Sequence, residues 1–439
     1  MYEKEEAKLH DMQKDLEKLS IPEDELTQAI QQGMQIAKTS KHRKKRSFKR
    51  IAWSISIAAL LFITLVTSIR VSPAFAKTVA SIPGLERLVD LIQYDKGLQA
   101  IVDNKYYEAI GVSQTKDNIK FTIDGVIVDE SGMVIFYTTE SPTKLSSGDY
   151  GMIEIFHNGK SLEGSTEYGY PDQENKKYRT DKIIFTFAEQ QKYISKEFEL
   201  KLNLRNEQKT SFSIPFTLNK DIQKGKVFTI NKEIIMDGQK IVIEDIILYP
   251  LRVAVNISFD QRNTMKILNF EDIRIEDERG EDWSSIRNGI SSFGGDDDYQ
   301  RTFFLQSNFF NQPENLFLKF DKVQALPKEE AYMIVDLDKK KVLKRSYQNK
   351  VVVTNISDHS IKVKMKVKNG DKRFGLIYEV KDAKNKRLDM PSIATWFDEE
   401  NNEANWEVEL KPQKLVNPVK VYFSDYPNYL KGSTSIQIK

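Results

Sequence analysis

Apolar positions near the N-terminus follow a helical period. They recur at intervals of three and four residues, which places them on one face of a helix. The sequence Ser20-Ile21-Pro22-Glu23 matches a capping box, so a second helix is expected to begin there. The pattern predicts two short amphipathic helices, at about residues 3–19 and 21–37. The apolar positions concerned are Leu9, Met12, Leu16, Leu19, Leu26 and Ile30.

The next segment, residues 51–69, contains no charged residue and follows a basic block at residues 38–50. A helix of this length rises about 28 Å, close to the ~30 Å hydrocarbon core of a bilayer. The pattern predicts one transmembrane helix, and the cations before it predict a cytoplasmic N-terminus and an extracellular C-terminus. A cleaved signal peptide is the alternative, with Ala74-Phe75-Ala76 as its small-residue site. A signal peptide has only a few residues before its apolar segment, whereas about fifty precede this one, so a retained helix is favoured.

From Tyr107 onward the period of apolar residues becomes two, which is the period of a β-strand with one buried face. A stretch also repeats itself. Residues 117–124 (DNIKFTID) correspond to residues 237–244 (DGQKIVIE), 120 positions later, and the register continues without a gap to Ile135 and Val255. The repeat predicts two units with the same fold.

Each unit has about 115 residues and a series of short strands, which favours an immunoglobulin-like β-sandwich. A third, shorter unit contains alternating lysines at 362, 364, 366 and 368. These are expected to line a solvated strand face or protect an edge, with a polyanion site as the alternative. The predicted fold class is mainly β, with a short helical cytoplasmic tail, one transmembrane helix and about three tandem immunoglobulin-like β-sandwich units. The predicted ranges are 1–50 for the cytoplasmic tail, 51–69 for the transmembrane helix, 70–106 for a juxtamembrane helical segment, and 107–222, 223–350 and 351–439 for β-sandwich units 1, 2 and 3.

Composition removes several classes of chemistry. The chain has no cysteine, which excludes disulfides, thiolate metal sites and cysteine nucleophiles. Its four histidines do not pair at metal-ligand spacing, and it has no P-loop, dinucleotide fingerprint or nucleophile elbow. Residues 294–298 (GGDDD) lack the alternating ligands of a calcium loop. The chain is therefore predicted not to be an enzyme and to need no cofactor or metal.

Charge is unevenly distributed, although the net charge is only +2. Residues 1–37 carry four basic and nine acidic side chains, whereas residues 38–50 carry eight basic ones. The basic block is expected to lie against anionic membrane lipid. No nucleic-acid binding is expected, because no aromatic stacking platform or recognition-helix pattern accompanies the block. The acidic helices favour a basic cytoplasmic partner, and a tail without a partner is the alternative.

Several short motifs occur in the order found in a known family. They are Ser72-Pro73-Ala74-Phe75-Ala76, Ile82-Pro83-Gly84-Leu85, Asp95-Lys96-Gly97-Leu98 and Ile123-Asp124-Gly125-Val126-Ile127-Val128-Asp129. From the basic block to about Glu140, the chain resembles single-pass membrane proteins of Gram-positive bacteria that carry the domain of unknown function 4179. The resemblance implies an anti-sigma factor for an extracytoplasmic-function sigma factor. The later units resemble the immunoglobulin-like domains that often follow.

The resulting hypothesis is a membrane-anchored anti-sigma factor-like regulator. Its tail would sequester a cytoplasmic sigma factor through the six apolar residues named above, and its extracellular part would sense an unidentified envelope signal or ligand. Release by proteolysis is expected, with Ala74 and Ala76 as the candidate cleavage site. The alternative is a membrane-anchored envelope-binding or structural protein with no signalling role.

Overall fold

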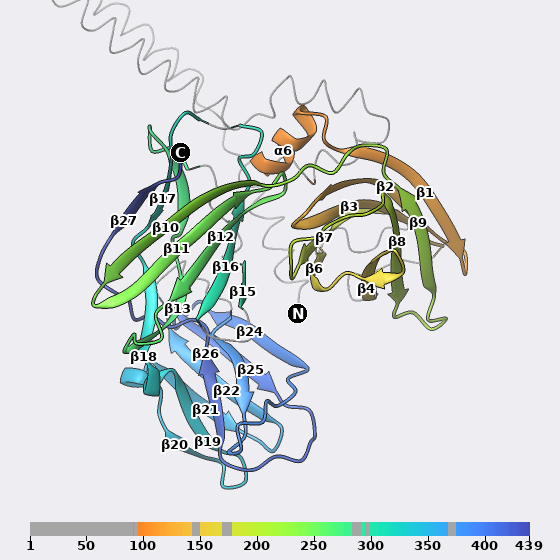
Figure 1. The fold of residues 1–439 in the computed structure, drawn as a ribbon. Coiled ribbons are helices and arrows are strands. Elements are labelled where there is room, and N and C mark those ends of the chain that lie inside the picture. Colours follow the sequence, from red (N-terminus) through yellow and green to blue (C-terminus); the bar gives the residue numbers. More distant parts are fainter. Residues whose placement is uncertain are drawn as a thin grey trace, which may run out of the picture. The chain divides into compact units, whose positions relative to one another are not determined.

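The computed structural model describes residues 91, 95–142, 150–168, 178–282, 291–294, 299–311, 313–367 and 375–439. The chain divides into two units, Met1–Ser72 and Pro73–Lys439, and all described residues lie in the second. They form one α-helix, α6 (Lys96–Asp103), two short 3-10 helices, η3 (Lys328–Glu330) and η4 (Tyr347–Asn349), and a series of β-strands arranged in three sandwiches (Figure 1).

The fold class expected from the sequence is confirmed as mainly β and corrected for its transmembrane helix. Among the described residues no helix is long and apolar enough to cross a membrane. The described helix α6 has 8 residues and rises about 12 Å, against the ~30 Å of a bilayer core. The run at 51–69 and the tail at 1–50 lie outside the described residues.

The first sandwich consists of two antiparallel sheets that enclose one apolar core. One sheet has the order β1-β2-β3-β7-β6 and the other the order β5-β4-β8-β9. Alternating residues of both sheets meet in this core, where the rings of Phe121 and Tyr137 stack with centroids 4.9 Å apart. The strands are β1 (Glu108–Lys116), β2 (Ile119–Asp129), β3 (Gly132–Glu140), β4 (Tyr150–His157), β5 (Lys160–Ser161), β6 (Gly164–Tyr168), β7 (Tyr178–Phe187), β8 (Glu197–Leu204) and β9 (Ser211–Thr217).

The second sandwich opposes a sheet of order β10-β11-β12-β16-β15 to two smaller sheets, β13-β18 and β14-β17-β27. Its core includes Phe270, whose ring packs edge-on against Phe303 and Phe320 with centroids 4.9 Å away in each case. The strands are β10 (Lys226–Met236), β11 (Gln239–Leu248), β12 (Arg252–Phe259), β13 (Met265–Phe270), β14 (Arg274–Asp277), β15 (Ser291–Gly294), β16 (Gln300–Gln306), β17 (Leu316–Phe320), β18 (Val323–Pro327) and β27 (Thr434–Gln437).

The internal repeat predicted from the sequence is present in the strand pairing. The larger sheet has corresponding strand orders in both sandwiches. The β1–β2 ladder shifts register between Ala109 and Val112, and the β10–β11 ladder shifts between Thr229 and Lys232, at the same offset of 120. The ladders β2–β3 and β11–β12 also shift at matching positions. Irregularities shared at one offset are stronger evidence for a repeat than alternation, because alternation is common to all half-buried strands.

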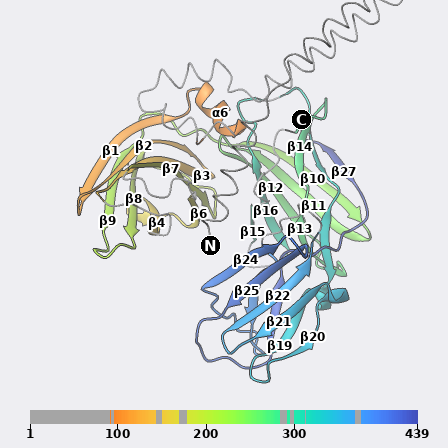
Figure 2. The same cartoon turned by 180° about the vertical axis from the view of Figure 1, so that it is seen from behind.

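The third sandwich is built from two four-stranded sheets, β20-β19-β26-β23 and β21-β22-β25-β24 (Figure 2). Trp406 is fully buried between them and is among the largest side chains of this core. The strands are β19 (Tyr332–Asp336), β20 (Lys341–Lys344), β21 (Val351–Ile356), β22 (Ser360–Lys366), β23 (Ile377–Lys381), β24 (Ser392–Asp398), β25 (Glu403–Glu409) and β26 (Val419–Phe423).

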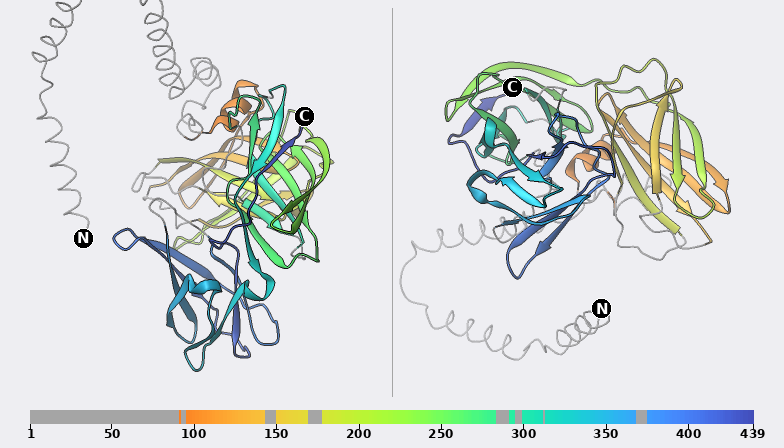
Figure 3. Two further views of the ribbon diagram at one scale, coloured as in Figure 1. Left: turned by 90° about the vertical axis from the view of Figure 1, so that its left-hand side faces the viewer. Right: turned by 90° about the horizontal axis from the view of Figure 1, so that it is seen from below.

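The chain passes twice between the second and third sandwiches. It leaves through β18 and η3 into β19, and it returns after β26 so that β27 pairs with β17 (Figures 1 and 3). The expected ranges placed residues 332–350 in the second unit and the final strand in the third. In the structure, β19 and β20 of that range belong to the third sandwich, and the final strand β27 belongs to the second. Alternation locates a strand but does not identify its partner.

Three of the alternating lysines, Lys362, Lys364 and Lys366, lie on the outward face of β22, and Lys368 lies outside the described residues. This strand pairs with β21 and β25, so the expected role in protecting a sheet edge is wrong. A solvated face is confirmed, since these lysines form ion pairs across the sheet: Lys362 with Glu407 at 3.1 Å and Lys364 with Glu403 at 3.0 Å.

Candidate functional site

The residues that the sequence singled out as functional lie outside the described part of the chain, so they stay predictions. The described residues offer a different candidate, at the junction between the first and second sandwiches. The tail residues are Leu9, Met12, Leu16, Leu19, Leu26 and Ile30, and the candidate cleavage residues are Ala74 and Ala76.

The two sandwiches contact each other through equivalent turns of the repeat. The turn after β2, residues 129–132, lies against the turn after β11, residues 249–252. Asp129 Oδ2 accepts a hydrogen bond from the backbone N of Leu251 at 2.6 Å. Arg252 reaches the opposite way and donates to Thr186 Oγ1 and, at 3.3 Å, to the backbone O of Phe185. Each turn therefore gives one charged side chain to the other sandwich.

Asp129 is completely buried, and its carboxyl group is surrounded by donors. Its Oδ1 accepts bonds from the N and Oγ of Ser131, both at 2.7 Å, and from the N of Gly132 at 3.1 Å. Burial raises the pKa of Asp129 above its ordinary value, and the bonds from Ser131 and the charge of Arg252 act against this rise. The group thus fixes its own turn and the neighbouring turn at once.

Arg252 is 8% exposed, and its guanidinium lies over the ring of Phe304, 5.3 Å from the centroid. Burial lowers the pKa of Arg252, whereas the charge of Asp129 raises it. Gly132 provides the space for this side chain. A Cβ at that position would lie 2.8 Å from Arg252 Nη2 and 2.3 Å from the backbone O of Phe185. The turn therefore requires glycine to admit the arginine.

A second buried acid ties the segment between β9 and β10 to the same junction. Glu130 is 9% exposed, and its Oε2 accepts a bond from the backbone N of Gly225 at 3.0 Å. Close by, the hydroxyl of Tyr106 donates to the backbone O of Val128 at 2.5 Å and accepts from the N of Gln223 at 2.9 Å. The connection between the two sandwiches is therefore held along its length by side chains.

Helix α6 contacts the second sandwich although it precedes the first in the sequence. Its N-cap residue Asp95 accepts a bond from the N of Leu98 at 3.0 Å and another from Nε2 of Gln306 in β16 at 2.7 Å. Just after the helix, the ring of Tyr106 lies 5.7 Å from that of Phe310. Because Tyr106 also bonds to the end of β2, α6 is joined to both sandwiches.

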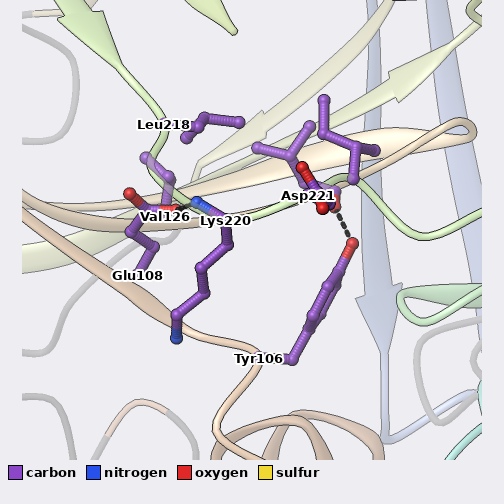
Figure 4. Close-up of a pocket in the computed structure, with 8 residues that line it drawn as sticks. Tyr106, Glu108, Val126, Leu218, Lys220 and Asp221 are labelled. Atoms are coloured by element: carbon purple, nitrogen blue, oxygen red, sulfur yellow. Dashed lines mark hydrogen bonds between the residues drawn. The ribbon is translucent and has the colours of Figure 1, made fainter.

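A cavity beside this junction is too small for a ligand. Tyr106, Glu108 and Lys220 are among the residues around it (Figure 4). Its volume is about 10 Å³, which is room for roughly one water molecule. Glu108 accepts a bond from the backbone N of Lys220 at 3.1 Å, so the polar groups here are bonded to one another. The junction is a packed interface rather than a binding pocket.

The chemistry of this junction is that of a buried acid and a buried base on different sandwiches. Each charge compensates part of the free-energy cost of burying the other. Loss of one charge therefore makes burial of the other less favourable. Neither residue was expected from the sequence to be functional. Asp129 ends one of the motifs quoted above, and Arg252 is the first residue of β12, directly before the apolar residues 253–255. Each is a charged residue directly beside an apolar run, and this pattern could have indicated a buried charge.

Two regions of this chain match known family models. Residues 45–141 match the domain of unknown function DUF4179, which confirms the resemblance found in the sequence, and residues 225–351 match the family of unknown function DUF5643. Asp129 lies in the first match and Arg252 in the second. No curated protein matches the chain. The solved structure described as "The crystal structure of the conserved domain protein from Bacillus anthracis" is 13% identical, covers 76% of this chain and 92% of its own, and has a TM-score of 0.35.

Proposed function

We propose that this chain is an anti-sigma factor-like regulator held at the cell membrane, with its tail in the cytoplasm and its β-sandwiches outside. The observation that carries the proposal is the DUF4179 match at residues 45–141, because this domain is consistent with an anti-sigma factor-like family. The proposed role is regulatory and involves no catalysis by the chain itself.

The tail supports the proposal through its sequence. Residues 1–37 combine a surplus of acidic side chains with apolar residues at helical spacing. An acidic amphipathic helix suits a partner with an apolar groove and a basic rim. A protein that contacts the phosphate backbone of DNA, such as a sigma factor, carries basic surface of this kind. The proposed contact residues are Leu9, Met12, Leu16, Leu19, Leu26 and Ile30.

The membrane location is supported by the basic block at residues 38–50 and by the apolar run that follows it. Clustered lysines and arginines are attracted to anionic lipid, by about 1 kcal/mol for each cation near the surface. In this proposal the block lies against the cytoplasmic leaflet.

The junction described above supports a route from the sandwiches to the tail. The described chain begins beside α6, whose cap residue Asp95 is bonded to Gln306 of the second sandwich. A ligand or stress that displaces the second sandwich would therefore pull on the segment that leads to the tail. Cleavage near Ala74 and Ala76, between α6 and the tail, is the proposed release step.

Replacement of one tail residue tests the sigma factor contact. The full-length chain is expected to co-purify with an extracytoplasmic-function sigma factor from its own host, and Leu16→Asp is expected to lose it because a carboxylate would enter an apolar contact. Gln13→Asp introduces the same charge outside the apolar seam and is expected to retain the partner. Recovery of a sigma factor by Leu16→Asp, or its absence from the wild-type preparation, would contradict the proposal.

Protease treatment of intact cells tests the location. The sandwiches are expected to be digested while the tail stays protected. Protection of the sandwiches would contradict the proposed topology. If the sandwiches are digested but no sigma factor is ever recovered, the alternative of an envelope-binding or structural protein without a signalling role gains support.

A further inference from the structure

A pocket of about 320 Å³ lies where the second sandwich meets the third. Small-molecule sites have volumes of about 300–1,000 Å³, so this one has room for a sugar-sized ligand. The second sandwich contributes the segment around β13 and the loop before β16, and the third contributes β19 and β26. The side chains that give the pocket its character are Lys266, Tyr299, Lys328, Tyr332, Lys420 and Tyr422.

Tyrosine rings form one wall of this region. The rings of Tyr332 and Tyr422 lie on paired positions of β19 and β26, with centroids 5.2 Å apart. Tyr378 of β23 continues the row, 6.3 Å from Tyr422. All three side chains are half-buried, so part of each ring stays accessible. A row of aromatic rings offers flat apolar surface together with polar hydroxyl tips.

Lysine ammonium groups lie between these rings. Lys420 Nζ is 5.2 Å from the centroid of Tyr332, and Lys266 Nζ is 5.3 Å from that of Tyr378. Lys266 also donates to the Tyr378 hydroxyl at 2.9 Å, which ties the second sandwich to the third. Each ring attracts a cation to its face, so the ammonium groups are held in place before any ligand arrives.

Two of the pocket lysines, Lys328 and Lys420, are not paired with the two acidic groups that line the pocket, Asp260 and Glu329. Asp260 is engaged by the guanidinium of Arg262 through bonds of 2.7 and 3.0 Å. Glu329 accepts a bond from the Tyr332 hydroxyl at 3.2 Å. Lys328 and Lys420 form no ion pair with a carboxylate in the described ranges, in contrast to Lys362 on the other sheet of this sandwich, which pairs with Glu407. Within the described part of the chain, the ammonium groups of Lys328 and Lys420 therefore lack a carboxylate partner.

We propose that this pocket binds a phosphate-bearing sugar or polyol. Ammonium groups are strong donors to phosphate oxygens, and the tyrosine faces suit the C–H surface of a sugar ring or polyol chain. The pocket is preorganised, because Leu268 of β13 and Leu326 of β18 pack in the core of the third sandwich and fix the two walls relative to each other. Neither domain match assigns a ligand to these residues. The inference goes beyond the regulatory proposal, and its test needs no sigma factor.

Titration calorimetry on the full-length chain, purified in detergent, provides the test. Glucose 6-phosphate is expected to bind at least about tenfold more tightly than glucose or inorganic phosphate, because only it engages both rings and cations. Lys420→Met keeps the length of the side chain and removes its charge, and it is expected to weaken binding by about tenfold or more. Lys362→Met is the matched control on the opposite sheet and is expected to bind as the wild type does.

A second variant and a second probe complete the test. Lys328→Met removes a second pocket charge from η3, outside the sheets, and applies the same test if Lys420→Met does not fold. A glycerol phosphate oligomer that binds more tightly than glucose 6-phosphate assigns the ligand to an envelope polymer, and the reverse order assigns it to a free sugar phosphate. No binding of either probe up to roughly 10 mM, or wild-type affinity in both pocket variants, would overturn the proposal.

Discussion

The two junctions between neighbouring sandwiches are held by different forces. At the first, the buried side chains are charged: Asp129 and Arg252 cross between two turns and bond to the opposite sandwich. At the second, two buried apolar side chains, Leu268 and Leu326, enter the core of the third sandwich, and the chain itself passes twice. The first junction therefore depends on the protonation and position of two groups. The second depends on volume and packing, which do not respond to pH.

Replacing Asp129 by alanine is expected to have the largest effect. The change leaves the backbone N of Leu251 buried without its acceptor and the charge of Arg252 buried without the nearby carboxylate. Loss of one partner from a buried charged pair costs about 3–5 kcal/mol. The free energy of unfolding of the full-length chain in urea measures this loss. Asp221→Ala is the control, since Asp221 is exposed and pairs with Lys196 at the surface. Similar unfolding free energies for Asp129→Ala and Asp221→Ala would contradict the role of the buried charge at the first junction.

Replacing Leu326 by alanine is expected to cost somewhat less, about 3 kcal/mol, because a fully buried side chain is removed from a shared core. This loss is expected to be the same at every pH at which the chain stays folded. Leu343→Ala is the control, since Leu343 is 52% exposed. A pH-dependent loss at Leu326 would show that this junction also relies on charge.

The third prediction concerns the pH dependence of the first junction. Burial raises the pKa of Asp129 above its ordinary value of 3.8, so the folded chain holds this proton more tightly than the unfolded chain. The stability from the protonated group is fully present below that ordinary value and is lost as pH rises through the folded-state pKa. Asp129→Asn cannot ionise. The unfolding free energy of the wild type minus that of this variant is therefore expected to fall as pH rises, and a flat or rising difference would contradict the account.

The smallest effect is expected for Glu403→Gln, on the outward face of the third sandwich. The bond from Lys364 lowers the pKa of Glu403 below its ordinary value of 4.5. The stability from this ion pair is therefore present above 4.5 and is lost as pH falls through the folded-state pKa, opposite in sign to Asp129. Because the pair lies at the surface, added salt is expected to weaken it. Unfolding in urea at low and at about 1 M salt measures this, and a salt-independent loss would contradict it.

Much of the β architecture could be predicted from the sequence, because alternation directly reports which residues of a strand face the core. In β26 (Val419–Phe423), for example, every second residue is buried. The repeat could be predicted because the shared bulges preserve one offset of 120 through both hairpins. The partner of β27 could not, because a short strand such as Thr434–Gln437 carries no mark of the sheet that it joins.

The two candidate sites could not be predicted from the sequence for a related reason. Asp129 and Arg252 are 123 positions apart, and nothing local reveals that two turns of a repeat contact each other. The pocket lysines also look like any other surface lysines. Lys420 and Lys362 both alternate with apolar residues in a strand, yet only Lys362 faces a carboxylate on the neighbouring strand. The distinction is made by cross-strand pairing, which is a property of the fold.

A double-mutant cycle between Asp129→Asn and Arg252→Met tests the charged junction most directly. The unfolding free energies of the wild type, both single variants and the double variant give the coupling between the two side chains. A coupling of at least about 1 kcal/mol is expected, because each buried charge compensates the other. Purely additive losses at the two positions would contradict it.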